Sequence, residues 1–351
     1  MSPRTPVDRR PPLRNAVTQH FSVQPEQVGM ELDEFLARLY PLTSKRVLRQ
    51  LVREGSVTVN AQPAAPSHRL RDDEVVLIEF DEDELPEASE PARYEGPLDL
   101  LYEDAHVAVV DKPADLLVEP ERWDESRPNL LEALAALAET RARTGGGEPF
   151  RPRLVHRLDK DTSGALVVAK TVEAERVLGL AFEQGGIDKR YLALVEGEMP
   201  LANGDSETID LAIGPDTKRN GRMRVRRDGK SSQTRVRVVE RFRGFTWVEC
   251  EPLTGRTHQI RVHLAAKGFP LAVDPLYGRR RALPLSDLKA GYRHKPGQAE
   301  LPLIARLTLH AFSVEFPLVD APERRARVEA PLPRDLERTL KQLAKVRPPR
   351  R

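Results

Sequence analysis

The apolar residues near the N-terminus recur at helical spacing in two successive runs, and each run predicts a short amphipathic helix. The first run spans residues 30–40 and ends at Pro41. The second spans residues 44–54 and ends before a glycine, which suits the end of a helix. Two short apolar runs at 57–60 and 74–80 then predict the strands of a small sheet.

The polar side of the second predicted helix is strongly basic. Cations at this spacing suit contacts with phosphates, and a merely solvated basic face is the alternative interpretation. The candidates for phosphate contacts are Lys45, Arg46, Arg49 and Arg53.

Between residues 98 and 320, short apolar runs of strand length are interspersed with helical patterns. Because strands dominate the centre, the pattern predicts an α+β fold: a mixed, largely antiparallel sheet with flanking helices, beside the small N-terminal α/β domain. The predicted strands include 105–111, 165–169 and 190–195, and the predicted helices span 129–142 and 171–184.

The composition is that of a soluble chain. Its 351 residues hold 56 Lys and Arg against 54 Asp and Glu, for a net charge of +2. The single cysteine, Cys250, excludes an internal disulfide and a cysteine-built zinc site. The longest apolar stretch, 130–138, is too short for a membrane span, and the basic start has no apolar signal region. We therefore expect a cytoplasmic protein.

Charge and proline content divide the chain further. Two basic segments, 219–241 and 323–351, suit either a polyanionic partner or a solvated surface. We predict a disordered basic arm at 1–28, the small domain at 29–80, an acidic linker at 81–97, the main domain at 98–320 and a basic C-terminal tail at 321–351.

The densest polar cluster is the loop at 156–164, between two apolar strands. In one interpretation Asp159 is a nucleophile or acid–base group beside cations. In a second, Ser163 and His156 form a hydrolase-like triad with an aspartate, although the G-x-S-x-G elbow is missing. In a third, the loop is a structural turn with solvated charges. The residues alone leave all three open.

A second polar cluster, Thr254–His263, opens a predicted helix. Arg256 and Arg261 are placed to reach an anion. His258 and His263 lie five apart without an H-E-x-x-H pattern, so we expect structural hydrogen bonds from them and no metal site.

Several segments in order resemble the RluA-type pseudouridine synthases, over about residues 98–318. The resemblance rests on LVHRLDKDTSGALVVAKT, RYLALVEG and GRTHQIRVHLAAKGFPLAVDPLYG, flanked by VVDKPADLLVEP and LTLHAFSVEFP. The N-terminal pattern resembles an S-four-type RNA-binding domain. Together they imply an isomerase that converts specific uridines of structured RNA, ribosomal or transfer, to pseudouridine by base flipping.

The resemblance also implies roles for single residues. Asp159 matches the catalytic aspartate, and Tyr191 matches the tyrosine that packs on the target base. Arg256 matches the arginine that pairs with the aspartate, with Arg261 as the alternative. Arg157 matches an arginine that fills the stack left by the flipped nucleotide.

The chain departs from the family pattern in two places. Asp115 and Glu119 stand where the family usually shows glycine and histidine, which puts the local loop geometry and the RNA contact there in doubt. Residues 279–300 have no clear family counterpart.

The expected chemistry needs no cofactor, because the isomerisation involves no net redox change. The sequence shows no P-loop and no G-x-G-x-x-G that opens a helix. We expect a monomer that binds RNA, without a membrane, metal or nucleotide cofactor. The rival hypotheses are an RNA-binding module without catalysis and, third, a hydrolase.

Overall fold

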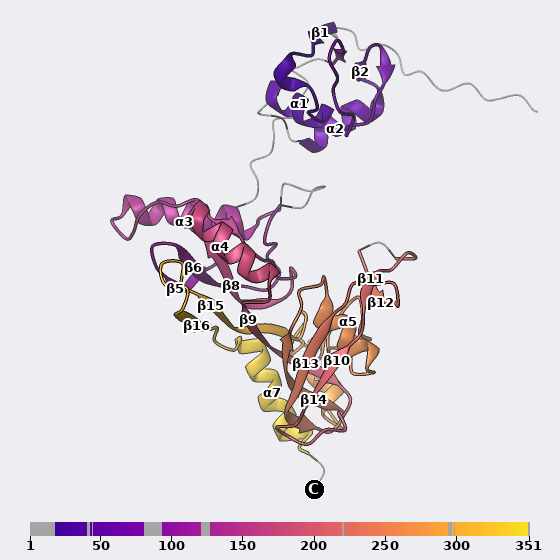
Figure 1. The fold of residues 1–351 in the computed structure, drawn as a ribbon. Helices are drawn as coiled ribbons and strands as arrows, with labels where there is room; N and C mark the ends of the chain where they lie inside the picture. The colour runs from indigo at the N-terminus through magenta and orange to yellow at the C-terminus, as the bar shows by residue number, and fades with distance from the viewer. Residues whose placement is uncertain are drawn as a thin grey trace, which may run out of the picture. The chain divides into compact units, whose positions relative to one another are not determined.

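The computed structural model describes residues 18–40, 43, 45–80, 93–120, 127–219, 221–293, 297 and 299–349. The chain divides into two compact units, Met1–Arg93 with Pro120–Pro128 and Tyr94–Glu119 with Asn129–Arg351 (Figure 1). Among the described residues, no helix combines the length and the apolar character that a membrane span requires.

The N-terminal unit contains two helices and a four-stranded sheet of order β1-β4-β2-β3. The two helices and the strands at 57–60 and 74–80 confirm the predictions from apolar spacing, and Leu32, Leu36 and Leu48 are fully buried between helices and sheet. The elements are β1 (Thr18–Ser22), a 3-10 helix η1 (Pro25–Gln27), α1 (Leu32–Leu39), α2 (Lys45–Glu54), β2 (Val57–Val59), β3 (Gln62–Pro63) and β4 (Val75–Glu79).

The prediction of a disordered arm at 1–28 is wrong for residues 18–28. β1 pairs antiparallel with β4 along its whole length. The Phe21 ring lies edge-on to Phe35, with ring centroids 6.2 Å apart, and Val23 is buried. Apolar burial therefore holds this segment in the sheet. Residues 1–17 and most of the predicted linker, 81–92, lie outside the described residues.

The second unit is built on a ten-stranded sheet of order β10-β13-β14-β9-β15-β8-β6-β5, with β16 on β15 and β7 on β8. Within its described residues, β15 and β8 pair in parallel and the other pairs are antiparallel, which confirms the predicted fold class. The sheet strands are β5 (Asp99–Glu103), β6 (Val107–Lys112), β7 (Arg153–Leu154), β8 (Ser163–Ala169), β9 (Asp188–Glu196), β10 (Ser206–Asp210), β13 (Gln233–Phe242), β14 (Phe245–Pro252), β15 (Leu309–Pro317) and β16 (Arg325–Glu329).

Helices and one hairpin complete this unit (Figure 1). α5 packs Ile260 and Leu264 into the apolar cluster formed by β9, β13 and β14. The remaining elements are α3 (Leu130–Arg143), α4 (Val172–Glu183), the hairpin strands β11 (Ile213–Pro215) and β12 (Met223–Val225), α5 (Gln259–Ala266), α6 (Leu285–Leu288) and α7 (Arg334–Val346).

The centre of the sheet positions the polar loop that precedes β8. Gly164 has a φ of +113°, and a Cβ there would lie 2.2 Å from the Ala311 carbonyl oxygen, so only glycine lets β8 approach β15 this closely. The neighbouring Ser163 hydroxyl lies 3.0 Å from Nδ1 of His310 on β15. The end of the loop is thus fixed against the sheet.

The predicted basic tail at 321–351 is wrong for most of its length. β16 extends the sheet, and α7 buries Leu336 and Leu343 completely. Arg306 holds the first turn of α7 through two hydrogen bonds of 2.7 Å to Asp335. The helix carries an apolar stripe between its cations, and the stripe packs against a cluster that includes Leu283 and Leu288.

Candidate active site

The loop that carries Asp159 is anchored by Lys112, the last residue of β6. Lys112 is fully buried, and its Nζ donates hydrogen bonds of 2.8 Å to the carbonyl oxygens of Pro113, Leu116 and Lys160. Burial lowers the pKa of Lys112 to about 7. Three carbonyl acceptors nevertheless favour the ammonium form, because it alone has three hydrogens to donate. Lys112 thus fixes the loop backbone beside Asp159.

The other end of the loop excludes the hydrolase-like interpretation. His156 Nε2 accepts a 2.9 Å hydrogen bond from the Val167 amide, and its ring stacks on Phe182. Burial lowers the pKa of His156 to about 3, so the ring is neutral. The Ser163 hydroxyl contacts His310 instead. His156 therefore serves the fold, and no Ser163–His156 pair forms.

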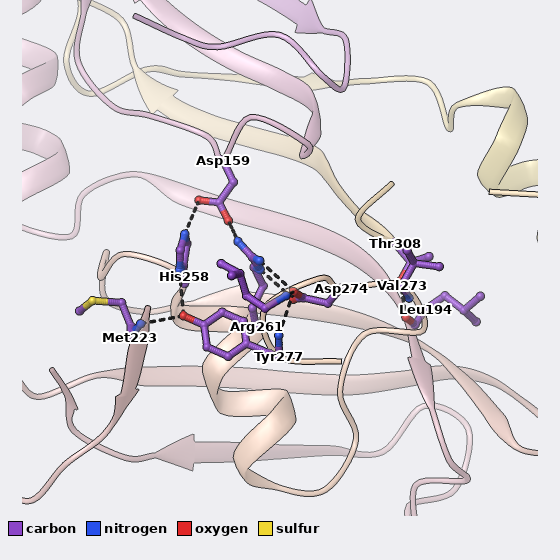
Figure 2. A network of polar contacts seen from close by, with 10 residues as sticks. Asp159, Leu194, Met223, His258, Arg261, Val273, Asp274, Tyr277 and Thr308 are labelled. Atoms are coloured by element: carbon purple, nitrogen blue, oxygen red, sulfur yellow. Dashed lines mark hydrogen bonds and ion pairs between the residues drawn. The ribbon is translucent and has the colours of Figure 1, made fainter. Parts of the chain in front are cut away.

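Asp159 forms an ion pair with Arg261 of α5, as Figure 2 shows. Arg261 Nη1 donates to Asp159 Oδ2 at 2.7 Å, while Nε and Nη2 hold both carboxylate oxygens of Asp274 at 2.8 and 2.9 Å. Burial lowers the pKa of Arg261, but hydrogen bonding to Asp274 and the charge of Asp159 raise it by more, so the net shift is upward. The guanidinium therefore links two carboxylates as a permanent cation.

Asp274 is fully buried and was not singled out from the sequence. Its Oδ1 also accepts hydrogen bonds from the Leu276 and Tyr277 amides at 2.8 and 3.1 Å, the pattern of an Asx turn. The turn orients the carboxylate towards Arg261. The only sequence signal was its place in the segment LAVDPLYG, which the resemblance already included.

The predicted pairing of Arg256 with Asp159 is wrong in this structure. Arg256 is exposed, and its Nε donates to the carbonyl oxygen of Ser231 at 3.2 Å. Its backbone is fixed by Gln259, whose Oε1 accepts from the Arg256 amide at 3.0 Å. Arg256 is thus exposed on the segment that precedes α5, and Arg261, the alternative, forms the ion pair with Asp159.

Tyr191 lies on β9 and packs against two apolar clusters, one of which includes Leu158 and Ala311. Burial raises the pKa of Tyr191, and the charge of Asp159 adds to the shift. The phenol is therefore neutral, which favours the ring as a packing surface over a deprotonated base. The structure places Asp159, Tyr191 and Arg261 in one neighbourhood.

Asp115 and Glu119, the two acids that depart from the family pattern, both contact the loop at 156–164. Glu119 accepts a 2.6 Å hydrogen bond from Arg157, and Asp115 lies 2.6 Å from Lys160. Asp115 has a φ of +66°, a conformation that aspartate tolerates better than most residues. The left-handed turn is thus kept without glycine. Arg157 is largely exposed and reaches solvent beside Asp159.

The basic face of α2 differs partly from the prediction. Arg49 donates a 2.6 Å hydrogen bond to Asp33, which is buried on α1, and only 20% of the Arg49 side chain is exposed. Arg49 therefore joins the two helices. Arg53 is exposed, whereas the side chains of Lys45 and Arg46 lie outside the described residues. Among the described residues there is no cluster of three or more potential metal ligands.

Comparisons with known proteins match both units. Residues 106–266 match the family described as RNA pseudouridylate synthase, and residues 30–76 match the S4 domain. An uncharacterized RNA pseudouridine synthase of Bacillus subtilis is 37% identical over 91% of this chain and 96% of its own. A ribosomal large subunit pseudouridine synthase D of Xanthomonas campestris is 36% identical over 95% of this chain and 94% of its own. The solved human RNA pseudouridylate synthase domain containing 1 is 27% identical, with a TM-score of 0.48 over 71% of this chain and 87% of that chain.

Proposed function

The chain belongs to the RNA pseudouridylate synthase family, isomerases that convert uridine to pseudouridine in RNA, and on that premise we propose that it modifies specific uridines of ribosomal RNA. The RNA class is supported by relatives of 34–36% identity named ribosomal large subunit pseudouridine synthase D, in Xanthomonas campestris and Pseudomonas aeruginosa. Transfer RNA is the alternative substrate.

We propose Asp159 as the catalytic residue, and the observation that carries this role is its contact with Arg261. Arg261 occupies Oδ2, while Oδ1 forms no hydrogen bond with any described residue. Asp159 thus offers one fixed oxygen and one oxygen available to substrate. The reaction breaks the N1–C1′ bond and forms the C5–C1′ bond, while N1 gains a proton and C5 loses one. A carboxylate could attack C1′, attack the base, or remove a sugar proton.

The neighbouring side chains support base flipping. A uridine inside a helix cannot place C1′ against Asp159, so the nucleotide must leave the stack. Tyr191 supplies an aromatic face for the extruded base. Arg157, exposed on the same loop, would fill the vacated position. The S-four-type domain, with Arg53 on the exposed side of α2, would add phosphate contacts.

The substitution Asp159→Asn tests this function. The amide keeps the shape of the side chain but cannot act as nucleophile or base, so release of tritium from RNA labelled at C5 of uridine should fall to background. RNA binding and the melting temperature should persist. Asp161→Asn, a carboxylate two residues along the same loop, is the matched control and should remain active. Turnover by Asp159→Asn at the wild-type rate would refute the assignment.

A further inference from the structure

A chain of polar contacts runs from the β11–β12 hairpin to Asp159, and it includes two residues to which the proposed function gives no role (Figure 2). The Met223 amide of β12 donates to the Tyr277 hydroxyl oxygen at 2.8 Å. That hydroxyl lies 2.9 Å from Nδ1 of His258. Nε2 of His258 lies 3.8 Å from Oδ1 of Asp159, the oxygen that Arg261 leaves available.

The contacts of Tyr277 favour one position for the hydrogen of His258. The Tyr277 oxygen accepts a hydrogen bond from the Met223 amide, and among the described residues Nδ1 is the acceptor that lies within hydrogen-bond distance of its O–H, so we assign the O–H as the donor to Nδ1. Burial lowers the pKa of His258, against the opposing charge of Asp159, so the ring is neutral and has a single N–H. With Nδ1 as acceptor, that hydrogen is on Nε2 and faces Asp159.

The environment of Tyr277 supports a fixed orientation of its hydroxyl. The guanidinium carbons of Arg222 and Arg261 lie 5.2 and 5.1 Å from the centre of the Tyr277 ring, within the range of cation–π contacts. Arg261 and Asp274, the other charged groups that act on His258, are themselves joined by two hydrogen bonds. The ring and its hydroxyl are thus held by a rigid set of partners.

The backbone at His258 indicates that its ring is there for these contacts. His258 has a φ of +56° at the residue that precedes α5, and its side chain makes no capping hydrogen bond. A histidine in a left-handed conformation is less favourable than glycine or asparagine. Such a conformation at a functional site suggests that another requirement outweighs local stability.

We propose that His258 is a positioning residue of the reaction, with its Nε2–H directed by Tyr277 to hold Oδ1 of Asp159. The proposal rests on the function assigned to Asp159 above. At 3.8 Å the two atoms are not hydrogen-bonded, and a small movement on binding RNA closes the gap. Asp159 is then held at both oxygens, by Arg261 and by His258, and Oδ1 keeps a second lone pair for the substrate.

Two substitutions distinguish this role from a structural one. Their expected order in thermal stability is the reverse of their expected order in activity. In His258→Gln the side-chain amide nitrogen reaches about as far as the Nε2 that it replaces, whereas the shorter amide of His258→Asn stops near the position of Nδ1. Asparagine is the better residue for the left-handed backbone. We therefore expect His258→Asn to be at least as stable as His258→Gln in thermal melting, and yet to be the less active.

The assay measures the release of tritium from RNA labelled at C5 of uridine by the full chain, under single-turnover and under steady-state conditions. His258→Asn should lower kcat about tenfold or more, the effect of one hydrogen bond to a charged group, with KM within about twofold. His258→Gln should recover most of that loss. Tyr277→Phe should lower kcat in the same way, and its effect should not add to that of His258→Asn.

The outcomes distinguish this inference from the function on which it rests. Wild-type kcat in His258→Asn, with Asp159→Asn inactive, would overturn the positioning role and leave Asp159 in place. Activities that follow the melting temperatures, with asparagine above glutamine, would overturn it as well. Full activity of Asp159→Asn would instead refute the proposed function itself.

Discussion

Replacing Arg261 by methionine should damage both stability and catalysis, because one guanidinium links two carboxylates. The change removes the cation but keeps much of the side-chain volume. Asp274, fully buried, is then left without the partner of its two hydrogen bonds at 2.8 and 2.9 Å. Breaking a buried pair in this way costs about 3–5 kcal/mol.

Two amide donors moderate that cost. The Leu276 and Tyr277 amides continue to bind Asp274 in the variant, so we expect the lower value, about 3 kcal/mol. For a unit of this size that loss corresponds to a fall of roughly 6–12 °C in melting temperature. The assay is thermal unfolding followed by circular dichroism, in parallel with tritium release.

The double variant Arg261→Met/Asp274→Asn separates the two effects. Asparagine keeps the Asx turn but carries no charge, so most of the lost stability should return. Activity should stay low, because Asp159 still lacks the hydrogen bond at Oδ2. Arg256→Met is the matched control: Arg256 is exposed and its side chain donates to the Ser231 carbonyl, so its kcat and melting temperature should stay near wild type. A wild-type melting temperature for Arg261→Met, or full activity of the double variant, would refute the reasoning.

Four further changes test other parts of the structure. Glu119→Gln frees Arg157 from an exposed ion pair, so RNA affinity at low salt should rise roughly two- to fivefold in filter binding, and weaker binding would show that Glu119 orients Arg157 for RNA. Burial, with the charge of Asp99, raises the pKa of Asp111 to about 6, so the folded state holds this proton more tightly and loses stability as pH rises from about 4 to about 6. Asp111→Asn should therefore raise the melting temperature above pH 6 and leave it unchanged below pH 4; an equal rise at both would contradict this cause. Neutralising Lys45, Arg46 and Arg53 should lower the salt slope of RNA binding by about 0.7–0.9 per lost phosphate contact. Arg49→Gln should instead lower the melting temperature of the N-terminal unit, because it leaves Asp33 buried and unpaired, and an unchanged transition would disprove that role.

Local patterns predicted the elements of the fold where one face of a segment is apolar. α1 and α2 follow from helical spacing, and β8 from a continuous apolar run. Two predictions failed for different reasons. β1 is held by pairing with β4, a contact that its own segment does not reveal. α7 does carry leucines at helical spacing, but the prediction gave more weight to the cations between them.

The functional site, like the fold, could be predicted from the sequence only in part. The polar loop at 156–164 was identified from residue types alone, because it is the densest polar cluster of the chain and lies between two apolar strands, where functional loops often occur. The choice between Arg256 and Arg261 was not, since it depends on burial of Arg261 against Asp274, whereas Arg256 is exposed. Asp274 and Lys112 were missed because their roles come from burial and from acceptors elsewhere in the chain.

The central claim is that Asp159 of this chain makes pseudouridine in ribosomal RNA, and mapping of pseudouridines in total RNA tests it most directly. Cells that lack the protein should lose defined ribosomal pseudouridines, the wild-type chain should restore them, and Asp159→Asn, expressed at the same level, should not. Asp161→Asn should restore them like the wild type. An unchanged ribosomal map in the deletion strain, or restoration by Asp159→Asn, would contradict the account.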